Sequence, residues 1–165
     1  MITISEATIH DFETIRKIAY DTWPVVYGEI VSKDQLDYML EKMYSDATLT
    51  DNLIHKGHFF ILAKEGPACL GFASYEHHYL GQNTTRLHKL YLNIDSQGKG
   101  IGKMLIDKIS ALAKENQCNA ISLNVNKFNK AFGFYIKMGF EVIAQEDLEI
   151  GYGYLMEDYK MEKKL

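Results

Sequence analysis

Three glycines and two lysines fall within six residues at the start of an apolar-patterned helix, in the stretch DSQGKGIGKMLIDKI from Asp95 to Ile109. Glycine costs about 1 kcal/mol relative to alanine inside a helix, so such a cluster needs a structural reason. An apolar run precedes it, and after it Ile101, Leu105 and Ile109 recur at the spacing of one helical face. The pattern predicts a glycine-rich turn between a strand and a helix.

A glycine-rich turn of this kind could belong to one of the known phosphate-binding motifs. A P-loop needs G-x-x-x-x-G-K-[ST], but Gln97 stands at the first glycine and Met104 at the hydroxyl position. A dinucleotide fingerprint needs G-x-G-x-x-G, and its last glycine is missing whether the motif starts at Gly98 or at Gly100. The mismatches disfavour a nucleotide-binding protein of either kind. What remains is Q-x-x-G-x-G, formed by Gln97, Gly100 and Gly102.

This turn still has the properties of an anion-binding site. Glycines let backbone N–H groups approach a ligand, and a helix start offers unsatisfied N–H groups in a positive potential. Lys99 and Lys103 would strengthen that potential. The alternative is a flexible turn with solvated lysines, and the glycine cluster by itself does not decide between the two.

The rest of the chain alternates between helical and strand patterns, without an internal repeat or a linker. Strands are expected at 2–7, 59–63, 69–75, 87–92 and 120–125, with a final pair at 140–150 and 154–163. Helices are expected at 10–23 (ended by Pro24), 33–44 (capped by Ser32) and 46–57 (stopped by Gly57), from the glycine cluster to about Asn116, and at 129–138. A chain of 165 residues with this order predicts one α/β (α+β) domain spanning 1–165.

The order of the elements also predicts how the strands are arranged. The three middle strands, 59–63, 69–75 and 87–92, most simply form an antiparallel meander. The unit of strand 87–92, the glycine helix and strand 120–125 should be a right-handed parallel crossover. A ligand is then expected at the carboxyl ends of these strands, beside the glycine turn.

Charge and cysteine content limit the partners and the compartment. A net charge of −4 argues against nucleic acid, since phosphate neutralisation needs a basic face. No stretch approaches the length of a membrane span, and no basic leader precedes the first strand, so neither a membrane partner nor export is expected. Cys69 and Cys118 lack a C-x-x-C spacing and are interpreted as buried thiols in a reducing cytoplasm.

Two motifs in this order resemble the signature of a known family. Q-x-x-G-x-G follows the strand LHKLYL, and NKAFGFYIKMGF is similar to a later A-x-x-F-Y-x-K-x-G-F helix through Ala131, Phe134, Tyr135, Lys137, Gly139 and Phe140. Both resemble the GNAT superfamily of acetyl-CoA-dependent N-acetyltransferases. The resemblance implies a mixed, mostly antiparallel central sheet with helices on both faces. Its one parallel crossover would be splayed to hold coenzyme A (CoA).

The resemblance also implies how acetyl-CoA, the cosubstrate, is held. Its pyrophosphate would bind the N–H groups of the turn, made of Gln97, Gly98, Lys99, Gly100, Ile101 and Gly102. Its pantetheine arm would pair with the splayed strand at Leu90, Tyr91 and Leu92, where the N–H of Leu92 would bind the thioester carbonyl. Tyr135 matches the general acid that protonates the departing thiolate.

One position departs from the family pattern. Phe128 stands where family members often carry asparagine, three residues before the motif Ala131. Asn126 and Asn129 flank it, and either could cap the following helix or bind the CoA arm. Asn129 is the better candidate because it adjoins the helix start.

A base for the acceptor amine is harder to find. An alkylamine with a pKa near 10.4 is neutral in roughly one molecule in a few thousand at pH 7, so a base or water relay is expected. The glutamate that many family members carry in the strand before the glycine turn is absent from TRLHKLYL. Alternation puts Arg86, His88, Leu90 and Leu92 on one face, which makes His88 one candidate base, and Glu76 is the other.

A metal site is not expected in the same region. Glu76 precedes His77 and His78, a run that looks metal-binding on paper. Adjacent strand residues point to opposite faces, so the two histidines would not converge on an ion.

Acidic and aromatic residues before the meander suggest a cationic acceptor. They are Trp23, Tyr27, Glu29, Asp34, Asp37 and Tyr38. Such side chains suit an amine through charge pairing and cation–π contact, and the chain's end is similar to that of proteins that acetylate polyamines. The leading prediction is direct transfer from acetyl-CoA to a primary amine, such as a polyamine, in a ternary complex. The alternatives are an acetyl-CoA-binding sensor without turnover, or an acetyltransferase for protein lysines or N-termini. A homodimer stays open.

Overall fold

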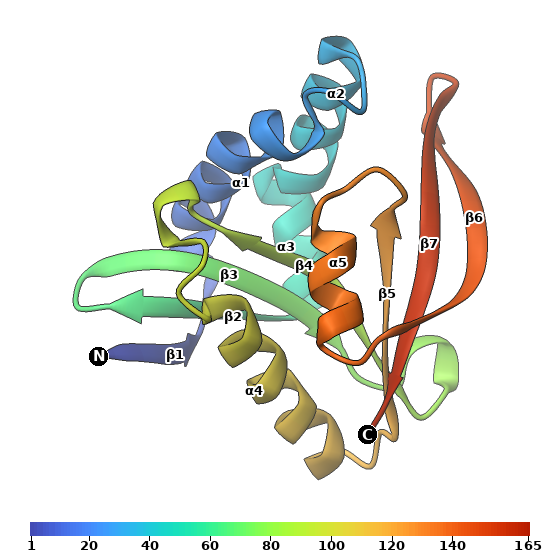
Figure 1. The fold of residues 1–165 in the computed structure, drawn as a ribbon. Helices are drawn as coiled ribbons and strands as arrows, with labels where there is room; N and C mark the ends of the chain where they lie inside the picture. Colours follow the sequence, from blue (N-terminus) through green and yellow to red (C-terminus); the bar gives the residue numbers. More distant parts are fainter.

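The computed structural model describes all 165 residues as one seven-stranded sheet with helices on both faces (Figure 1). The strands are β1 (Ile2–Glu6), β2 (Phe59–Glu65), β3 (Ala68–Glu76), β4 (Thr84–Leu92), β5 (Ala120–Asn126), β6 (Glu141–Gly151) and β7 (Tyr154–Lys164). The helices are α1 (Phe12–Tyr27), α2 (Lys33–Tyr44), α3 (Asp46–Ile54), α4 (Ile101–Glu115) and α5 (Ala131–Lys137). Short 3₁₀ turns lie at Ile9–Asp11, Tyr79–Gly81 and Ile94–Ser96. None of the helices has the length and apolarity needed to span a bilayer.

The sheet confirms the predicted mixed topology. Its strand order is β1-β2-β3-β4-β5-β7-β6, and every neighbouring pair is antiparallel except β4 and β5. The unit β4–α4–β5 is therefore the expected parallel crossover. Helices α1, α2 and α3 cover one face of the sheet, and α4 and α5 cover the other (Figure 1).

Two hydrophobic cores follow from strand alternation. Along β2, Ile61 and Ala63 pack toward α4, whereas Phe60 and Leu62 pack toward α1. The α4-side core includes Leu87, Ile101, Leu105, Ile109, Leu123, Val125, Tyr135 and Phe140. The α1-side core includes Phe12, Ile15, Trp23, Leu36, Tyr44, Phe60, Phe72 and Met156. Alternate residues of a strand thus belong to different cores, one beneath α4 and α5 and the other beneath α1, α2 and α3.

The helix ends agree with the sequence at Ser32 and disagree at Pro24. The Ser32 side chain accepts a hydrogen bond from the N–H of Gln35, as a capping residue should. Pro24 does not end α1, which continues to Tyr27 and closes with the N–H of Gly28 bonded to the Pro24 carbonyl. A proline lacks the backbone N–H donor, so one helical hydrogen bond is missing near the end of α1, and the helix still continues to Tyr27. Helix α3 ends at Ile54, before the predicted stop at Gly57, which takes φ +69° in the following turn.

The feature that positions the site is the separation of β4 from β5. The two strands pair only between Thr84–Arg86 and Ala120–Ser122, and they diverge from Leu87 onward. On its other side β4 stays paired with β3 as far as Leu92. The sheet is therefore open between Leu87–Leu92 and Leu123–Val125, where the sequence predicted a splay.

Gly71 keeps β4 in place on the far side of this opening, and we expect Gly71→Ala to disturb it. A Cβ at Gly71 would lie 2.9 Å from the Tyr91 carbonyl oxygen and 3.2 Å from the Leu92 Cα. Relief requires a backbone shift, so the substitution should lower the free energy of unfolding by about 1–3 kcal/mol, measured by urea denaturation. The control is Gly133→Ala in α5, where an added Cβ meets nothing within 4 Å and should stabilise the helix slightly. Equal urea midpoints for Gly71→Ala and wild type would refute the close approach.

Candidate functional site

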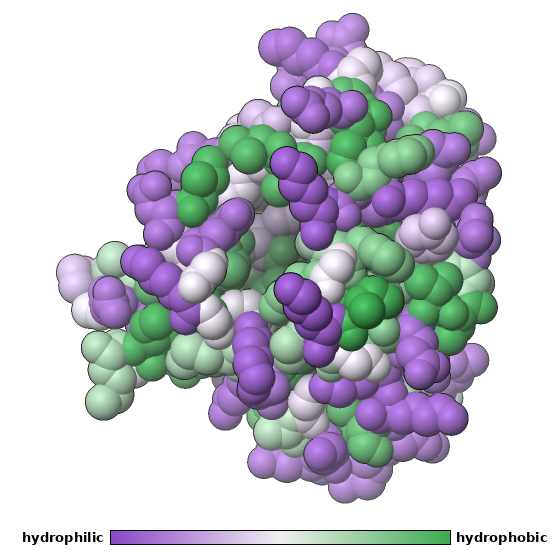
Figure 2. Space-filling view, in the orientation of Figure 1, coloured by the Kyte–Doolittle hydropathy of each residue, from purple (hydrophilic) through white to green (hydrophobic).

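A cavity of about 1000 Å³ occupies the opening between β4 and β5. Figure 2 shows this face hollowed at its centre, with hydrophilic side chains around the hollow. Of the residues predicted from sequence, His88, Leu90, Tyr91, Leu92, Gln97, Gly98, Gly100, Ile101, Gly102, Asn129 and Tyr135 line the cavity. Lys99 is exposed and outside the lining, where Lys103 stands instead, and Glu76 lies behind His88. The structure thus brings the two motifs together around one space.

The turn requires glycine for two different structural reasons. Gly98 and Gly100 have φ of +80° and +76°, a left-handed backbone that other residues rarely adopt. Gly102 lies in the first turn of α4, where an added Cβ would be 3.0 Å from the Phe134 ring. Its small size therefore lets α4 approach α5 closely. The turn exposes its backbone to the cavity at the positive end of α4, as an anion site requires.

Two backbone N–H groups of β4 face the opening. The Asn93 N–H donates to the Leu70 carbonyl, and bonded pairs alternate along an antiparallel ladder. Tyr91, opposite Phe72, is then in a bonded pair and directs its N–H toward β3. Leu90 and Leu92 direct theirs the other way, into the space that β5 has left. The edge of β4 can therefore pair with an extended, amide-bearing ligand.

Tyr135 of α5 also lines this cavity. It is buried at 8 % exposure, and its hydroxyl makes no hydrogen bond within the protein. Burial, followed by the field of Tyr27, raises the pKa of Tyr135, so the phenol stays protonated at neutral pH. The Tyr27 hydroxyl is 3.0 Å from the Tyr91 hydroxyl, which places three phenols around one part of the cavity.

Both candidate asparagines hold the turn between β5 and α5. Asn126 Oδ1 accepts from the Phe128 N–H at 2.9 Å, and Asn129 Oδ1 accepts from the Ala131 N–H at 2.8 Å. Asn129 also lines the cavity, whereas Asn126 contributes no lining. Both side chains thus stabilise the loop that leads into α5, whose N-cap residue is Lys130, and of the two only Asn129 has access to a ligand.

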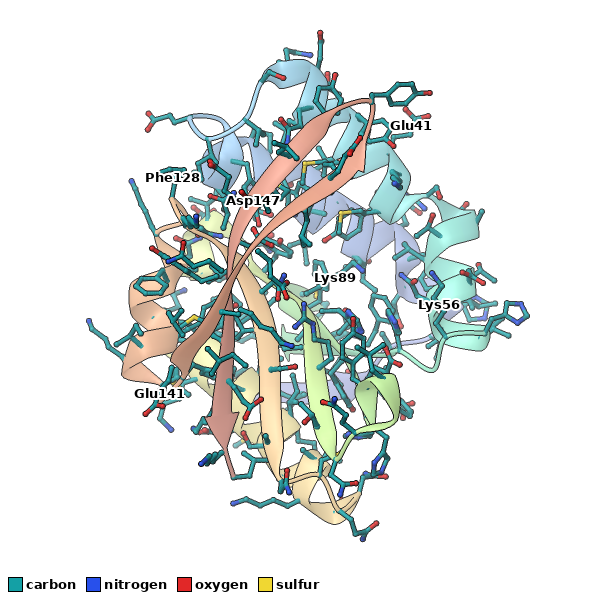
Figure 3. The ribbon with its side chains drawn as sticks, turned by 90° about the vertical axis from the view of Figure 1, so that its right-hand side faces the viewer. Glu41, Lys56, Lys89, Phe128, Glu141 and Asp147 are labelled. Carbon is teal, nitrogen blue, oxygen red and sulfur yellow. The ribbon has the colours of Figure 1, made fainter.

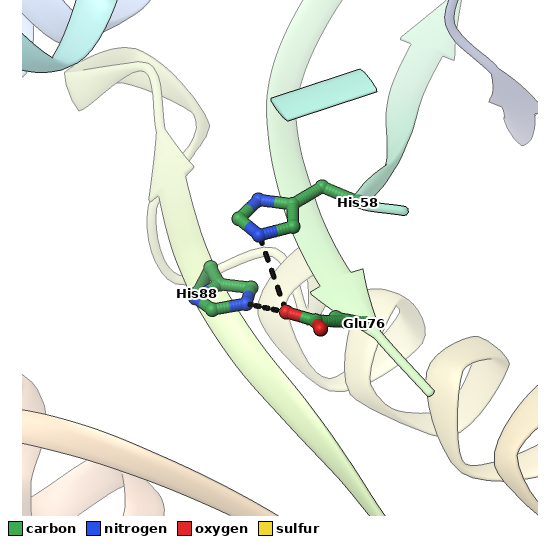
Figure 4. Close-up of side chains that lie close together, drawn as sticks. All are labelled: His58, Glu76 and His88. Carbon is green, nitrogen blue, oxygen red and sulfur yellow. Dashed lines mark hydrogen bonds and ion pairs between the residues drawn. The ribbon is translucent and has the colours of Figure 1, made fainter. Parts of the chain in front are cut away.

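His88 and Glu76, two alternatives in the sequence, are one hydrogen-bonded unit (Figure 4). His88 Nε2 is 2.9 Å from Glu76 Oε1, and His58 Nε2 is 3.2 Å from the same oxygen. The rings of His58 and His88 stack with centroids 3.9 Å apart. The sequence did not indicate His58 as a site residue. It comes just before β2, and no residue near it in the sequence links it to β3 or β4.

A bulge in β4 corrects the predicted face of His88. Tyr75 pairs with Leu87 and Ser74 with Lys89, so His88 is an extra residue. Leu90 and Leu92 pack toward the α4-side core, whereas His88 stacks on His58 on the opposite face. His88 therefore does not share a face with Leu90 and Leu92, because the bulge breaks the alternation between them.

The surroundings of His88 keep its ring neutral. Burial lowers the pKa of His88 most, and the fields of His58, Lys89, Arg86 and Lys56 lower it further. Burial, then the field of Lys56, also lowers the pKa of Lys89, to about 8. Lys89 lies between the sheet and the helices (Figure 3), with Nζ 5.6 Å from the ring centroid of Tyr44. The Lys89 ammonium thus loses its proton more easily than a lysine in water.

The histidine–glutamate cluster contains residue types that can bind a metal ion. Ligand atoms of His58, Glu76 and His88 lie within 4.8 Å of one another. The two rings stack 13° from parallel, and both Nε2 atoms contact the same Glu76 oxygen, so the three side chains are joined through hydrogen bonds to one carboxylate. The other two histidines predicted apart, His77 and His78, do not join the cluster: His77 bonds Thr85 and His78 lies 4.0 Å from Cys118.

The acidic and aromatic residues of the first two helices have different locations. Tyr27 and Glu29 line the cavity, and Trp23 is buried in the α1-side core. Asp34 and Asp37 are exposed on α2, and Tyr38 packs against Tyr152 and Tyr154 of the β6–β7 hairpin. Two of the six residues, Tyr27 and Glu29, therefore line the cavity, and the other four do not.

Comparison with known proteins gives a consistent picture. The model of the Acetyltransferase (GNAT) family matches residues 12–140. A spermidine N(1)-acetyltransferase from Thermoplasma acidophilum is 27% identical over 168 residues, covering 99% of this chain and 97% of the relative. The uncharacterised N-acetyltransferase YuaI of Bacillus subtilis is 28% identical over 156 residues, covering 91% of this chain and 86% of the relative.

A solved structure is similar over the same length. The PaiA N-acetyltransferase of Thermoplasma acidophilum, crystallised with coenzyme A, superposes with a TM-score of 0.85. It is 27% identical and covers 100% of this chain and 99% of its own. The two chains therefore share one fold over their whole length.

Proposed function

The chain belongs to the acetyltransferase (GNAT) family, and on that premise we propose that it acetylates a small cationic primary amine such as a polyamine. The family makes it an acetyl-CoA-dependent N-acetyltransferase. The observation that carries the proposal is the opening of the sheet at β4 and β5, with the glycine turn and Tyr135 both lining the cavity there. Similarity to a spermidine acetyltransferase over 99% of the chain supports a polyamine acceptor.

Acetyl-CoA fits the cavity by the chemistry of its parts. Its pyrophosphate would bind the backbone of Gln97–Gly102, at the positive end of α4 and beside Lys103. Its pantetheine arm carries amides that would pair with the free edge of β4. The N–H groups of Leu90 and Leu92 are the donors available for that arm and for the thioester carbonyl, with Leu92 our candidate for the carbonyl. Asn129 is a further donor on the opposite wall.

Transfer then needs two proton movements. The acceptor nitrogen attacks the thioester carbonyl, and a backbone N–H of β4 stabilises the oxyanion that forms. When the carbon–sulfur bond breaks, the Tyr135 hydroxyl donates its proton to the thiolate. The dry surroundings that raise the pKa of Tyr135 disfavour a free thiolate as well. The donated proton leaves a phenolate on Tyr135, which takes a proton back from solvent when CoA departs as the free thiol.

The base in this proposal is His88 with Glu76. A neutral His88 that donates its Nε2–H to Glu76 keeps a lone pair on Nδ1, and His88 lines the cavity. The Glu76 carboxylate, in hydrogen-bond contact with the ring, would offset part of the burial that lowers the pKa of His88 when the ring takes a proton. The depressed pKa of Lys89, which lines the cavity, supports a lowered pKa for an amine bound beside it, and this would reduce the demand on the base.

The test is acetyl-CoA-dependent release of free thiol across polyamines, alkylamines, amino acids, aminoglycosides and lysine peptides. We expect saturable release with polyamines above all. Release only with lysine peptides would transfer the proposal to a protein acceptor. Binding of acetyl-CoA without release in any class would replace the enzyme by a sensor.

Lys103→Gln should weaken acetyl-CoA binding about 3- to 10-fold at low salt. Lys103 lines the cavity beside the glycine turn, and its charge favours a pyrophosphate there, while its 2.6 Å ion pair with Asp107 reduces the effect. The dissociation constant, measured by calorimetry at 0.05 M and 0.5 M salt, should differ from wild type less at high salt. Lys108→Gln, an exposed substitution further along α4, is the control. Equal effects of the two substitutions would contradict the prediction.

A further inference from the structure

We propose that Asp158, with Asn124 and Glu146, forms an anchor for the distal ammonium of a polyamine acceptor, the amine that does not react. This inference rests on the proposed function and names the residues that select its substrate. The anchor lies on β5, β6 and β7, beside the cavity rather than in its CoA-binding part. No residue of the chain's two sequence motifs belongs to it.

Strand register places these side chains on the acceptor side of the sheet. Asp158 of β7 lies opposite Asn126 of β5 and opposite Glu146 of β6, and directly opposed residues share a face. Met156, two residues before Asp158, packs into the α1-side core. The carboxylates therefore lie on the face that α1 and α2 cover.

The hydrogen bonds of this group leave two oxygens without a donor. Asn124 Nδ2 donates to Glu146 Oε2 at 3.1 Å and to Asp158 Oδ2 at 3.4 Å. Asp158 Oδ1 and Asn124 Oδ1 are buried and have no hydrogen-bond partner. Asp158 is only 6 % exposed, and leaving a buried carboxylate oxygen unsatisfied is costly. Both free atoms are acceptors, so the missing partner is a group with several N–H donors.

The charge of the group is also not neutralised by contact. Neither Arg86 nor Lys160, cations on the same face, forms an ion pair with Asp158 or Glu146. Burial raises the pKa of Asp158 most, the hydrogen bond from Asn124 and the field of Arg86 lower it, and the field of Glu146 raises it. An alkylammonium supplies both a positive charge and three donors, which is what two carboxylates and a free amide oxygen can bind.

Tyr27 connects the anchor with the reaction centre. The field of Asp158 acts on the hydroxyl of Tyr27, and the field of Tyr27 acts on Tyr135, so the phenol lies near both. Tyr27 and Asn124 both line the cavity. A carboxylate in contact with an amine favours its charged form, which would oppose attack on the thioester. Asp158 therefore suits the amine that stays charged, and the reacting amine lies toward His88.

Asp158→Asn tests the anchor with two acceptors, spermidine and an alkyl monoamine of similar length. We expect kcat/KM for spermidine to fall about 10- to 100-fold, mainly through KM, since a charge-assisted hydrogen bond is lost. The monoamine should keep its kcat/KM, and acetyl-CoA should keep its Kd. Glu157→Gln, on the exposed opposite face of β7, is the matched control and should change neither acceptor. Glu146→Gln should give a smaller loss with spermidine alone.

Two results would overturn the anchor. Equal losses for spermidine and the monoamine in D158N would assign Asp158 to the reacting amine or to folding, and unchanged kinetics would leave it no role. Equilibrium binding of spermidine separates this inference from the proposed function. If wild type binds spermidine without acetylating it, and D158N does not bind it, the anchor stands and the polyamine acetyltransferase does not.

Discussion

Replacing Tyr135 with phenylalanine should lower kcat about 100- to 1000-fold and leave the Kd of acetyl-CoA unchanged. The hydroxyl lines the cavity and bonds nothing within the protein, so its loss removes a proton donor without breaking a structural contact. The ring, packed against Phe140 and Phe134, stays in place. The departing thiolate would then have to leave unprotonated in a space that disfavours its charge.

The measurement is steady-state thiol release combined with calorimetry for acetyl-CoA. Tyr75→Phe is the matched control, because Tyr75 is a buried tyrosine of the same core that does not line the cavity. Its variant should keep wild-type kcat. A loss of the same size in both variants, or a change in Kd alone for Tyr135→Phe, would remove Tyr135 from the proton transfer.

Much of the fold could be predicted because its signals are local. The alternation of strands, the helical spacing after Gly102 and the cap at Ser32 each depend on residues close in sequence. The cavity lining was predictable for the same reason: the glycine turn and the helix around Tyr135 each carry their motif in a few consecutive residues. A strand–helix–strand crossover then leaves few ways to place the two motifs together.

The parts that sequence missed depend on contacts between distant strands. A bulge in β4 exists only relative to its partner β3, and it turns His88 away from the face of Leu90. His58 reaches Glu76 and His88 only after three strands have paired. One weak feature of the sequence could have indicated Asp158: it is an acid at an inward-facing strand position between Met156 and Lys160. Its buried, unsatisfied oxygen is visible only in the folded chain.

The base makes the second large prediction: His88→Gln should lower kcat/KM about 100-fold at pH 7, with little change in acetyl-CoA affinity. Without the His88 base, the variant can acetylate only acceptor molecules that have already lost a proton to water. The neutral fraction of an amine with a pKa near 10.4 rises about tenfold per pH unit up to that value. The deficit of His88→Gln should therefore shrink as the pH is raised from 7 to 9.5, and a purely structural role of His88 would give a deficit that is constant with pH.

Glu76→Gln distinguishes the charge of the carboxylate from its geometry. Glutamine can keep the 2.9 Å contact to His88 Nε2 through its amide oxygen, but it cannot stabilise the imidazolium. We expect a loss of about tenfold at pH 7 that narrows with pH in the same way, because only the proton-accepting step is weakened. His55→Gln, an exposed histidine that follows α3, should behave as wild type at every pH. If Glu76→Gln keeps full activity while His88→Gln does not, the ring acts without the carboxylate. If both keep full activity, the acceptor loses its proton elsewhere, and burial of the amine in the space that lowers the pKa of Lys89 becomes the sufficient cause.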